Sequence, residues 1–170
     1  MDGRRLLLEG GSLVAALILG VSGVAPAHAE PGSGKQTLEG VWQGELTILS
    51  ACGPTGVPVA QFPGLITYTS DGKVIETPAT PAGPDPTTVR TSPGLGTWQH
   101  EGGQQFSNIF RFFNITVPGS FPAGSATIKQ AIELSQDGNS YTVTGTADFF
   151  DSAGNLIVHD CHTETGTRLN

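Results

Sequence analysis

The chain has little of what most catalytic or nucleic-acid-binding proteins display. It has two cysteines and one methionine among 170 residues, and eight lysine and arginine residues against fifteen aspartate and glutamate residues. The basic residues are not clustered and the net charge is −7, so nucleic acid and anionic lipid are poor candidate partners. The sequence also has no G-x-S-x-G, H-E-x-x-H, P-loop or dinucleotide-binding fingerprint. Motifs therefore predict no catalytic residue and no cofactor.

Long apolar runs are absent outside the N-terminus. Arg4 and Arg5 precede the apolar stretch Leu13–Val24, and Ala27-His28-Ala29 has the small residues of a signal-peptidase site. Residues 1–29 are therefore expected to be a signal peptide that is cleaved near Ala29, which places the mature protein outside the cell or in the periplasm. A membrane anchor is the alternative, although the stretch is shorter than the ~20 residues of a spanning helix. No second such run follows, so no membrane span is expected in the mature protein.

The remaining residues are enough for one domain. Residues 30–37 are polar and contain glycine, and we expect them to form a flexible N-terminal segment. The single domain is then expected over residues 38–168.

The two cysteines, Cys52 and Cys161, are predicted to form a disulfide, because an even pair in an exported protein usually does. A metal site is the alternative, since His159 and His162 flank Cys161. In a strand, His159 and Cys161 would share one face while His162 would point to the other. The sequence therefore favours the disulfide, and no metal site is predicted.

What the chain does have is a succession of short segments in which apolar and polar residues alternate, separated by turn residues. No helical pattern lies between these segments, which predicts an all-β fold. The fold class is an eight-stranded antiparallel up-and-down barrel, with an incompletely closed barrel or a sandwich as the alternative. The expected strands are 38–49, 64–69, 73–77, 94–100, 104–115, 126–134, 140–150 and 156–165.

Two connections between these segments are long and rich in proline. The first runs from Cys52 to Gly64 and the second from Pro78 to Pro93. Both are expected to be loops, because proline cannot donate a hydrogen bond to a strand ladder. The segment 78–93 is interpreted either as a lid at the barrel mouth or as a solvated spacer.

The segment 104–115 is the most apolar of the predicted strands. A strand that is apolar on both faces is covered on both sides or lines a cavity. Arg111, in the middle of this strand, either binds the carboxylate of an amphipathic ligand or points outward with its stem over apolar surface. The acidic residues Glu45, Glu76 and Asp148 are expected to face solvent. The candidate ligand-binding residues are Trp98, Phe106, Phe110, Phe112 and Arg111, with a barrel filled by its own side chains as the alternative.

Gly40-Val41-Trp42 begins the first segment and Arg168 follows the last. This arrangement resembles the lipocalins and their calycin relatives. The resemblance implies that Trp42 closes one end of an eight-stranded barrel while Arg168 packs across its ring, a cation–π contact of about 0.5–2 kcal/mol. The C-terminal helix and the second sequence motif of the lipocalins are not expected. The form without a helix also resembles the allene oxide cyclase and dirigent barrels.

Three functions are compatible with such a barrel. The first is a secreted, non-enzymatic carrier of a small hydrophobic molecule, which would be its partner. The second is a barrel-type isomerase or cyclase, which requires a convergent polar group inside the barrel. The third is an extracellular interaction module with a solid core. A void would separate the first two from the third, and a titratable residue lining that void would separate the second from the first.

Overall fold

The computed structural model describes residues 37–78, 88–90, 92–116 and 122–170. The predicted signal peptide, nearly all of the segment 30–37 and much of the connection 78–93 lie outside these ranges. Within the ranges there is no helix with the length and apolarity needed to cross a membrane.

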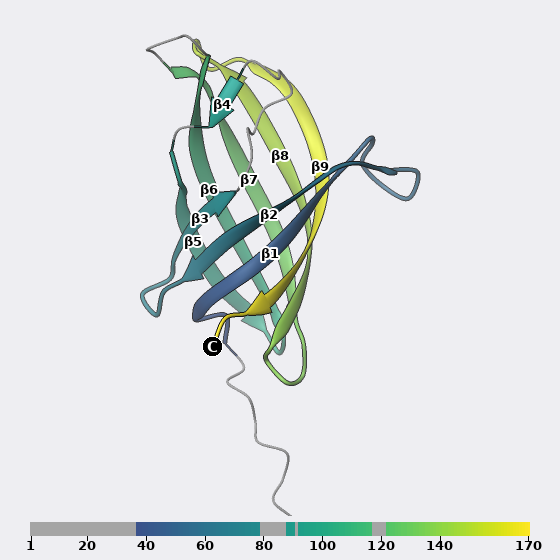
Figure 1. The fold of residues 1–170 in the computed structure, drawn as a ribbon, viewed down its shortest axis with the longest axis vertical. Coiled ribbons are helices and arrows are strands. Elements are labelled where there is room, and N and C mark those ends of the chain that lie inside the picture. The colour runs from purple at the N-terminus through teal and green to yellow at the C-terminus, as the bar shows by residue number, and fades with distance from the viewer. Residues whose placement is uncertain (1–36, 79–87, 91, 117–121) are drawn as a thin grey trace, which may run out of the picture. The chain divides into compact units, whose positions relative to one another are not determined.

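Nine strands form one sheet, and eight of them close into an antiparallel barrel (Figure 1). Around the ring the order is β1, β2, β3, β5, β6, β7, β8 and β9, and β9 pairs with β1 to close it. The ninth, β4, pairs with the end of β6 and with no other strand in the part of the chain that the structure describes. The predicted fold class is therefore confirmed. The strands are β1 (Gly40–Leu49), β2 (Pro58–Tyr68), β3 (Lys73–Pro78), β4 (Thr88–Arg90), β5 (Gly94–Gly102), β6 (Gln105–Thr116), β7 (Pro122–Leu134), β8 (Ser140–Asp151) and β9 (Leu156–Arg168).

Two of these strands lie partly or wholly in segments that were predicted to be loops. The strand β2 begins at Pro58, although Cys52–Gly64 was expected to be a loop, and its first half pairs with β1. β3 pairs with β2 only from Gly64 onward, so among the described residues the first half of β2 has a partner strand on one side only. A proline is tolerated where a strand is paired on one side. The short strand β4 lies inside the segment predicted to be a loop throughout.

Tight turns join several neighbouring strands. Gly72 between β2 and β3 has a φ of 81°, and Gly138 between β7 and β8 has a φ of 71°. Both values lie in the left-handed region, which glycine enters without the penalty that a Cβ imposes. These turns hold consecutive strands side by side as antiparallel neighbours in the ring.

Alternate residues of the barrel strands point inward, and the apolar ones among them form one core. In β6, Phe106, Phe110 and Phe112 are 2%, 3% and 3% exposed, whereas Ile109 on the other face is 45% exposed. The core residues of the described chain are Leu38, Trp42, Ile66, Tyr68, Val74, Phe106, Phe110, Phe112, Ala126, Ile128, Ile132, Leu134, Tyr141, Val143, Ala147 and Phe149, with Trp98 and Val158 packed against them.

One end of the barrel is closed by Trp42 and Arg168. The Trp42 ring is fully buried, and the Arg168 guanidinium lies 4.2 Å from the centre of that ring. The same guanidinium donates hydrogen bonds to the backbone carbonyls of Thr37, Glu39 and Gly138. Arg168 therefore connects the chain before β1, the turn between β7 and β8, and the end of β9.

The disulfide between Cys52 and Cys161 is present, as predicted. It joins the loop after β1 to β9, and these two strands are neighbours in the ring. The hairpin of β1 and β2 extends past β9 in Figure 1. The disulfide joins the loop between these two strands to Cys161 of β9.

Candidate functional site

The lumen contains a belt of polar side chains halfway along the barrel, between apolar layers. Each of these side chains is nearly or fully buried, and together they come from six of the eight barrel strands. Ionisable groups are rarely retained at such depth unless they are paired or have a function. The residues of this lumenal cluster are Tyr68, Glu76, Asn108, Gln130, Tyr141, His162 and Glu164.

Hydrogen bonds connect most of the cluster into one chain that ends at a carboxyl group. Tyr141 Oη donates to Glu164 Oε1 at 2.5 Å, and Gln130 Nε2 donates to Glu164 Oε2 at 2.9 Å. Asn108 Nδ2 donates to Gln130 Oε1 at 2.7 Å and contacts Tyr68 Oη at 3.1 Å. Both oxygens of Glu164 are therefore held by fixed donors from two other strands.

Burial raises the pKa of Glu164 to about 7, far above the usual value of 4.5. The hydrogen bonds from Tyr141 and Gln130 oppose this shift, and the nearby Glu76 adds to it. A carboxyl group with a pKa near 7 exchanges its proton readily at neutral pH, which is the property of a general acid or base.

The tyrosines of the cluster remain protonated. Burial raises the pKa of Tyr141 well above its normal value of 10, and the charge of Glu164 raises it further. Burial likewise raises the pKa of Tyr68 well above its normal range. Tyr141 is thus a permanent hydrogen-bond donor beside a group that gains and loses a proton.

His162 is neutral in the folded protein. It is 2% exposed, and burial lowers its pKa to about 4. Gln130 Nε2 lies 3.2 Å from His162 Nε2, and an amide nitrogen can only donate. His162 Nε2 is therefore the acceptor, and the ring proton is on Nδ1. The ring fixes the Gln130 amide without adding charge to the lumen.

A row of glycines makes room for the cluster. Gly64, Gly44 and Gly166 are in register across β2, β1 and β9, and Gly166 pairs with Tyr141 of β8. A Cβ on Gly44 would lie 2.3 Å from Glu164 Oε1, and one on Gly166 would lie 2.1 Å from Tyr141 Cζ. The carboxyl and the phenol occupy the volume that other residues would fill at these positions.

A small cavity of about 10 Å³ adjoins the two buried carboxyl groups, Glu76 and Glu164. This volume is about that of one water molecule. Leu46 and Phe62 also line the cavity and are only half-buried. They lie next to the half of β2 that pairs on one side only in the described residues. The cavity therefore places the two carboxyl groups beside half-buried side chains at this side of the barrel.

One acceptor in the cluster lacks a donor. Asn108 Oδ1 is buried and has no hydrogen-bond partner among the described residues, and the same holds for Asn114 Oδ1 farther along β6. An unpaired buried acceptor costs about 1–3 kcal/mol. A molecule that brings a donor to either oxygen would recover this cost.

The aromatic residues predicted to bind a ligand lie inside the barrel on both sides of the polar belt. Phe106 precedes Asn108 on the inner face of β6, while Phe110 and Phe112 follow it, and all three are buried. Trp98 is half-buried, packs against Phe106 at 5.9 Å between ring centres, and donates from Nε1 to the carbonyl of Thr69. These rings form an apolar wall around the polar cluster.

Arg111 is not part of this inner set. It lies on the outer face of β6, where Nε donates to Thr127 Oγ1 at 3.1 Å and the guanidinium lies 5.9 Å from the centre of the Phe150 ring. Of the two interpretations of Arg111 from the sequence, this position corresponds to the outward-pointing arginine whose stem lies over apolar surface. In this position it cannot reach a carboxylate in the lumen.

A wide groove of about 850 Å³ crosses the outer face from β9 to β5. Three adjacent rows of residues line it, in register across these five strands. The middle row carries inward side chains, including Asn108, Gln130 and His162. The outer rows combine threonine and serine with other residues, which are Gln99, Ile109, Lys129, Ala131 and Cys161. The sheet therefore separates this groove from the lumenal cluster.

Sequence reasoning missed the central residues of the cluster, and for one of them it was wrong. Glu76 was expected to face solvent but is 6% exposed inside the barrel. Its position two residues after Val74, which is buried on the same face of β3, was the available signal. For Glu164 the signal was weaker, because the inward residues of β9 around it are nearly all polar.

No protein-family model matches the chain, and no curated protein sequence matches it. The closed barrel and its lumenal cluster are therefore the observations on which a functional proposal depends.

Proposed function

We propose that the barrel is an acid–base enzyme of the isomerase or cyclase type, which acts on a small and mainly apolar molecule in its lumen. The observation that carries this proposal is the Glu164 carboxyl, which is buried, has a pKa near 7 and borders a cavity. A group of this kind is the feature that distinguishes an enzyme from a carrier in this fold.

Five members of the cluster have a role in this proposal. Glu164 takes a proton from the molecule or gives one to it. Tyr141 donates a hydrogen bond to the carboxyl and stabilises its negative form once the proton has left. Gln130, fixed by Asn108 and the neutral His162, holds the second oxygen and so sets the direction in which the carboxyl faces.

The walls of the site determine the class of molecule. Leu46, Phe62 and Ile66 line the cavity beside the two carboxyl groups, so the molecule is expected to be mainly hydrocarbon. A donor group on it would pair with the free Asn108 Oδ1. Because the cavity is small, binding requires the half-buried side chains of Leu46 and Phe62 to move aside.

A carrier without chemistry is the second candidate. The closed barrel, the Trp42–Arg168 end and the wall of aromatic rings support a lipocalin-like or calycin-like carrier of a hydrophobic molecule. In such a carrier Glu164 would serve only to bind, and its replacement would leave the bound molecule chemically unchanged.

We also propose that the protein acts outside the cell or in the periplasm. The disulfide supports an oxidising compartment, and the leader-like sequence of residues 1–29 supports export. Intact mass measurement of the protein recovered from its own host tests this directly. We expect the mass of a chain that begins at Glu30. The mass of all 170 residues would contradict export with cleavage of the leader.

The function is tested with the protein purified from the medium or periplasm of its host. Native mass spectrometry first identifies any molecule that copurifies, and that molecule is then incubated with fresh protein in D₂O. Glu164→Gln keeps the size of the side chain but removes its proton chemistry. Glu133→Gln, on the exposed outer face of β7, is the matched control.

The enzyme proposal expects the parent and E133Q to convert the molecule or to exchange deuterium into it, and E164Q to lose this activity by at least a hundredfold. Binding without conversion or exchange in all three proteins would contradict the enzyme and establish the carrier. Absence of any bound molecule, together with no binding of hydrophobic fluorescent probes, would contradict both.

A further inference from the structure

We propose that Cys52, Cys161 and His159 form a Zn²⁺ site on the outside of the barrel when the disulfide is reduced. The site differs from the lumenal cluster in place and chemistry. The disulfide and the metal site are alternative states of the same two sulfur atoms, so the redox state decides whether metal binds.

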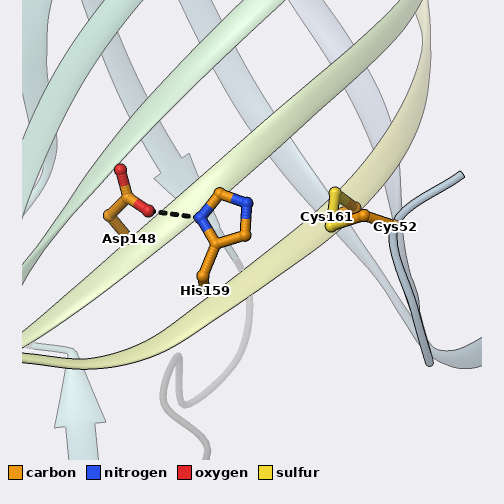
Figure 2. A network of polar contacts seen from close by, with 4 residues as sticks. All are labelled: Cys52, Asp148, His159 and Cys161. Atoms are coloured by element: carbon orange, nitrogen blue, oxygen red, sulfur yellow. Dashed lines mark hydrogen bonds and ion pairs between the residues drawn. A yellow bond between two sulfur atoms is a disulfide. The ribbon is translucent and has the colours of Figure 1, made fainter.

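The three residues lie close together, and the two sulfur atoms, which are bonded to each other in the disulfide, must move apart for both to bind one Zn²⁺. The two sulfur atoms and a ring nitrogen of His159 all lie within 4.8 Å of one another. Figure 2 shows the second ring nitrogen of His159 on the side that faces the sulfur atoms. Two thiolates and one imidazole are a donor set that Zn²⁺ prefers, with a water molecule as the fourth ligand.

Asp148 positions the histidine for this role. Its Oδ1 lies 2.5 Å from His159 Nδ1, which leaves Nε2 as the nitrogen available to a metal (Figure 2). A carboxylate behind a histidine is the usual support of a zinc-bound imidazole, because it fixes the ring and increases its basicity. The two residues face each other from β8 and β9, where Asp148 and His159 are in register.

The loop that carries Cys52 is held by backbone hydrogen bonds as well as by the disulfide. Ser50 N donates to the carbonyl of Val57, and Gly56 N donates to the carbonyl of Gly53. A Cβ on Gly56 would lie 2.2 Å from the carbonyl oxygen of Ala51, so the loop is closed tightly on itself. Cys161 is fixed by its place in β9. The two thiols are therefore expected to stay close together after the bond is cut.

A dithiol reductant can reduce the Cys52–Cys161 disulfide. The dithiol gives two electrons and two protons to the Cys52–Cys161 bond, which becomes two thiols, and the reductant becomes a cyclic disulfide. Binding of Zn²⁺ then displaces the two thiol protons. Cys52 is exposed and Cys161 partly exposed, so a small reductant can reach the bond.

Binding is measured with Co²⁺ and Zn²⁺ alone, on the whole protein in its oxidised and phosphine-reduced forms. The reduced parent is expected to bind one Co²⁺ with a thiolate-to-cobalt absorption band, which Zn²⁺ then abolishes. The oxidised parent is expected to show no such band. His159→Ala is expected to weaken binding by more than tenfold, and Asp148→Asn by about tenfold to a hundredfold.

His100→Ala is the control, because His100 is also an exposed histidine on a strand but lies on β5. It is expected to bind metal like the parent. Equal affinity of the reduced parent and His159→Ala would overturn the proposal, and so would binding by the oxidised protein. If reduction unfolds the barrel, the proposal expects Zn²⁺ to restore its circular dichroism, and failure to restore it would overturn the proposal as well.

Discussion

At the scale of single residues, Glu164 and His162 make opposite contributions to the pH dependence of folding. The folded protein holds the Glu164 proton up to about pH 7, while the unfolded chain loses it near 4.5. The stability that Glu164 contributes is therefore full below pH 4.5 and is lost as the pH rises to about 7. His162 stays neutral down to about pH 4 but is protonated near 6.5 when unfolded. Its contribution is present above pH 6.5 and is lost as the pH falls to about 4.

These opposite contributions predict how the free energy of unfolding of two variants depends on pH. Each group changes the free energy of unfolding by about 1.4 kcal/mol per pH unit inside its window, so the two nearly cancel in the parent between pH 4.5 and 6.5. Urea unfolding at a series of pH values should show that Glu164→Gln becomes more stable from pH 4 to 6.5. His162→Gln should become less stable from pH 4.5 to 7. If both variants kept the parent's pH profile, the two groups would not be buried as described.

The glycine row gives a second prediction at this scale. Gly44→Ala places a methyl group where Glu164 Oε1 now lies, so the carboxyl must leave Tyr141. We expect a loss of about 1–3 kcal/mol in the free energy of unfolding. The same substitution in a Glu164→Ala background should cost much less, because the clash is gone. The loss in the free energy of unfolding is measured by urea unfolding in both backgrounds. Equal losses would show that Gly44 does not make room for the Glu164 carboxyl.

Residue patterns could predict the apolar half of the lumen but not its polar half. Phe106, Phe110 and Phe112 were placed together because apolar side chains repeat on one face of β6. In β9 both faces carry polar side chains, so alternation alone does not show which face is inside. Only closure of the ring, through the pairing of β9 with β1, shows that His162 and Glu164 face the lumen.

At the scale of elements, the ends of strands were harder to predict than their centres. The first half of β2 contains Pro58 and Pro63, which argued for a loop. This half pairs with β1 alone in the described residues, and an edge position removes the penalty that proline carries in a central strand. The prediction therefore failed where a tertiary feature, the pairing of this half with β1, overrode the local effect of proline.

At the closed end of the barrel, Arg168 joins the chain before β1 and the turn between β7 and β8 to the end of β9. Arg168 donates to three carbonyls, those of Thr37, Glu39 and Gly138, and covers Trp42. Arg168→Lys keeps the charge but cannot reach all three acceptors. We expect it to lower the free energy of unfolding by about 1–3 kcal/mol. Arg111→Lys, on the exposed outer face, is the control, and equal thermal midpoints for both variants would contradict the role of Arg168.

At the scale of the whole molecule, the disulfide connects positions that are 109 residues apart. Closing so long a loop reduces the entropy of the unfolded chain, which is worth about 2–5 kcal/mol in proteins of this size. The double variant Cys52→Ser/Cys161→Ser should therefore unfold at a lower urea concentration than the oxidised parent. The reduced parent without metal should match the variant. If the double variant matched the oxidised parent instead, the disulfide would contribute nothing to the stability of the barrel.

The central claim is that a barrel with an apolar wall holds one carboxyl group ready to exchange its proton near neutral pH. The most direct measurement is carbon-13 NMR of the Glu164 side-chain carboxyl between pH 4 and 9, assigned by comparison with E164Q. We expect a single titration with a midpoint near pH 7. A midpoint near the ordinary value of 4.5 would contradict it, because Glu164 would then be ionised at neutral pH and unable to act as the acid of the proposed site.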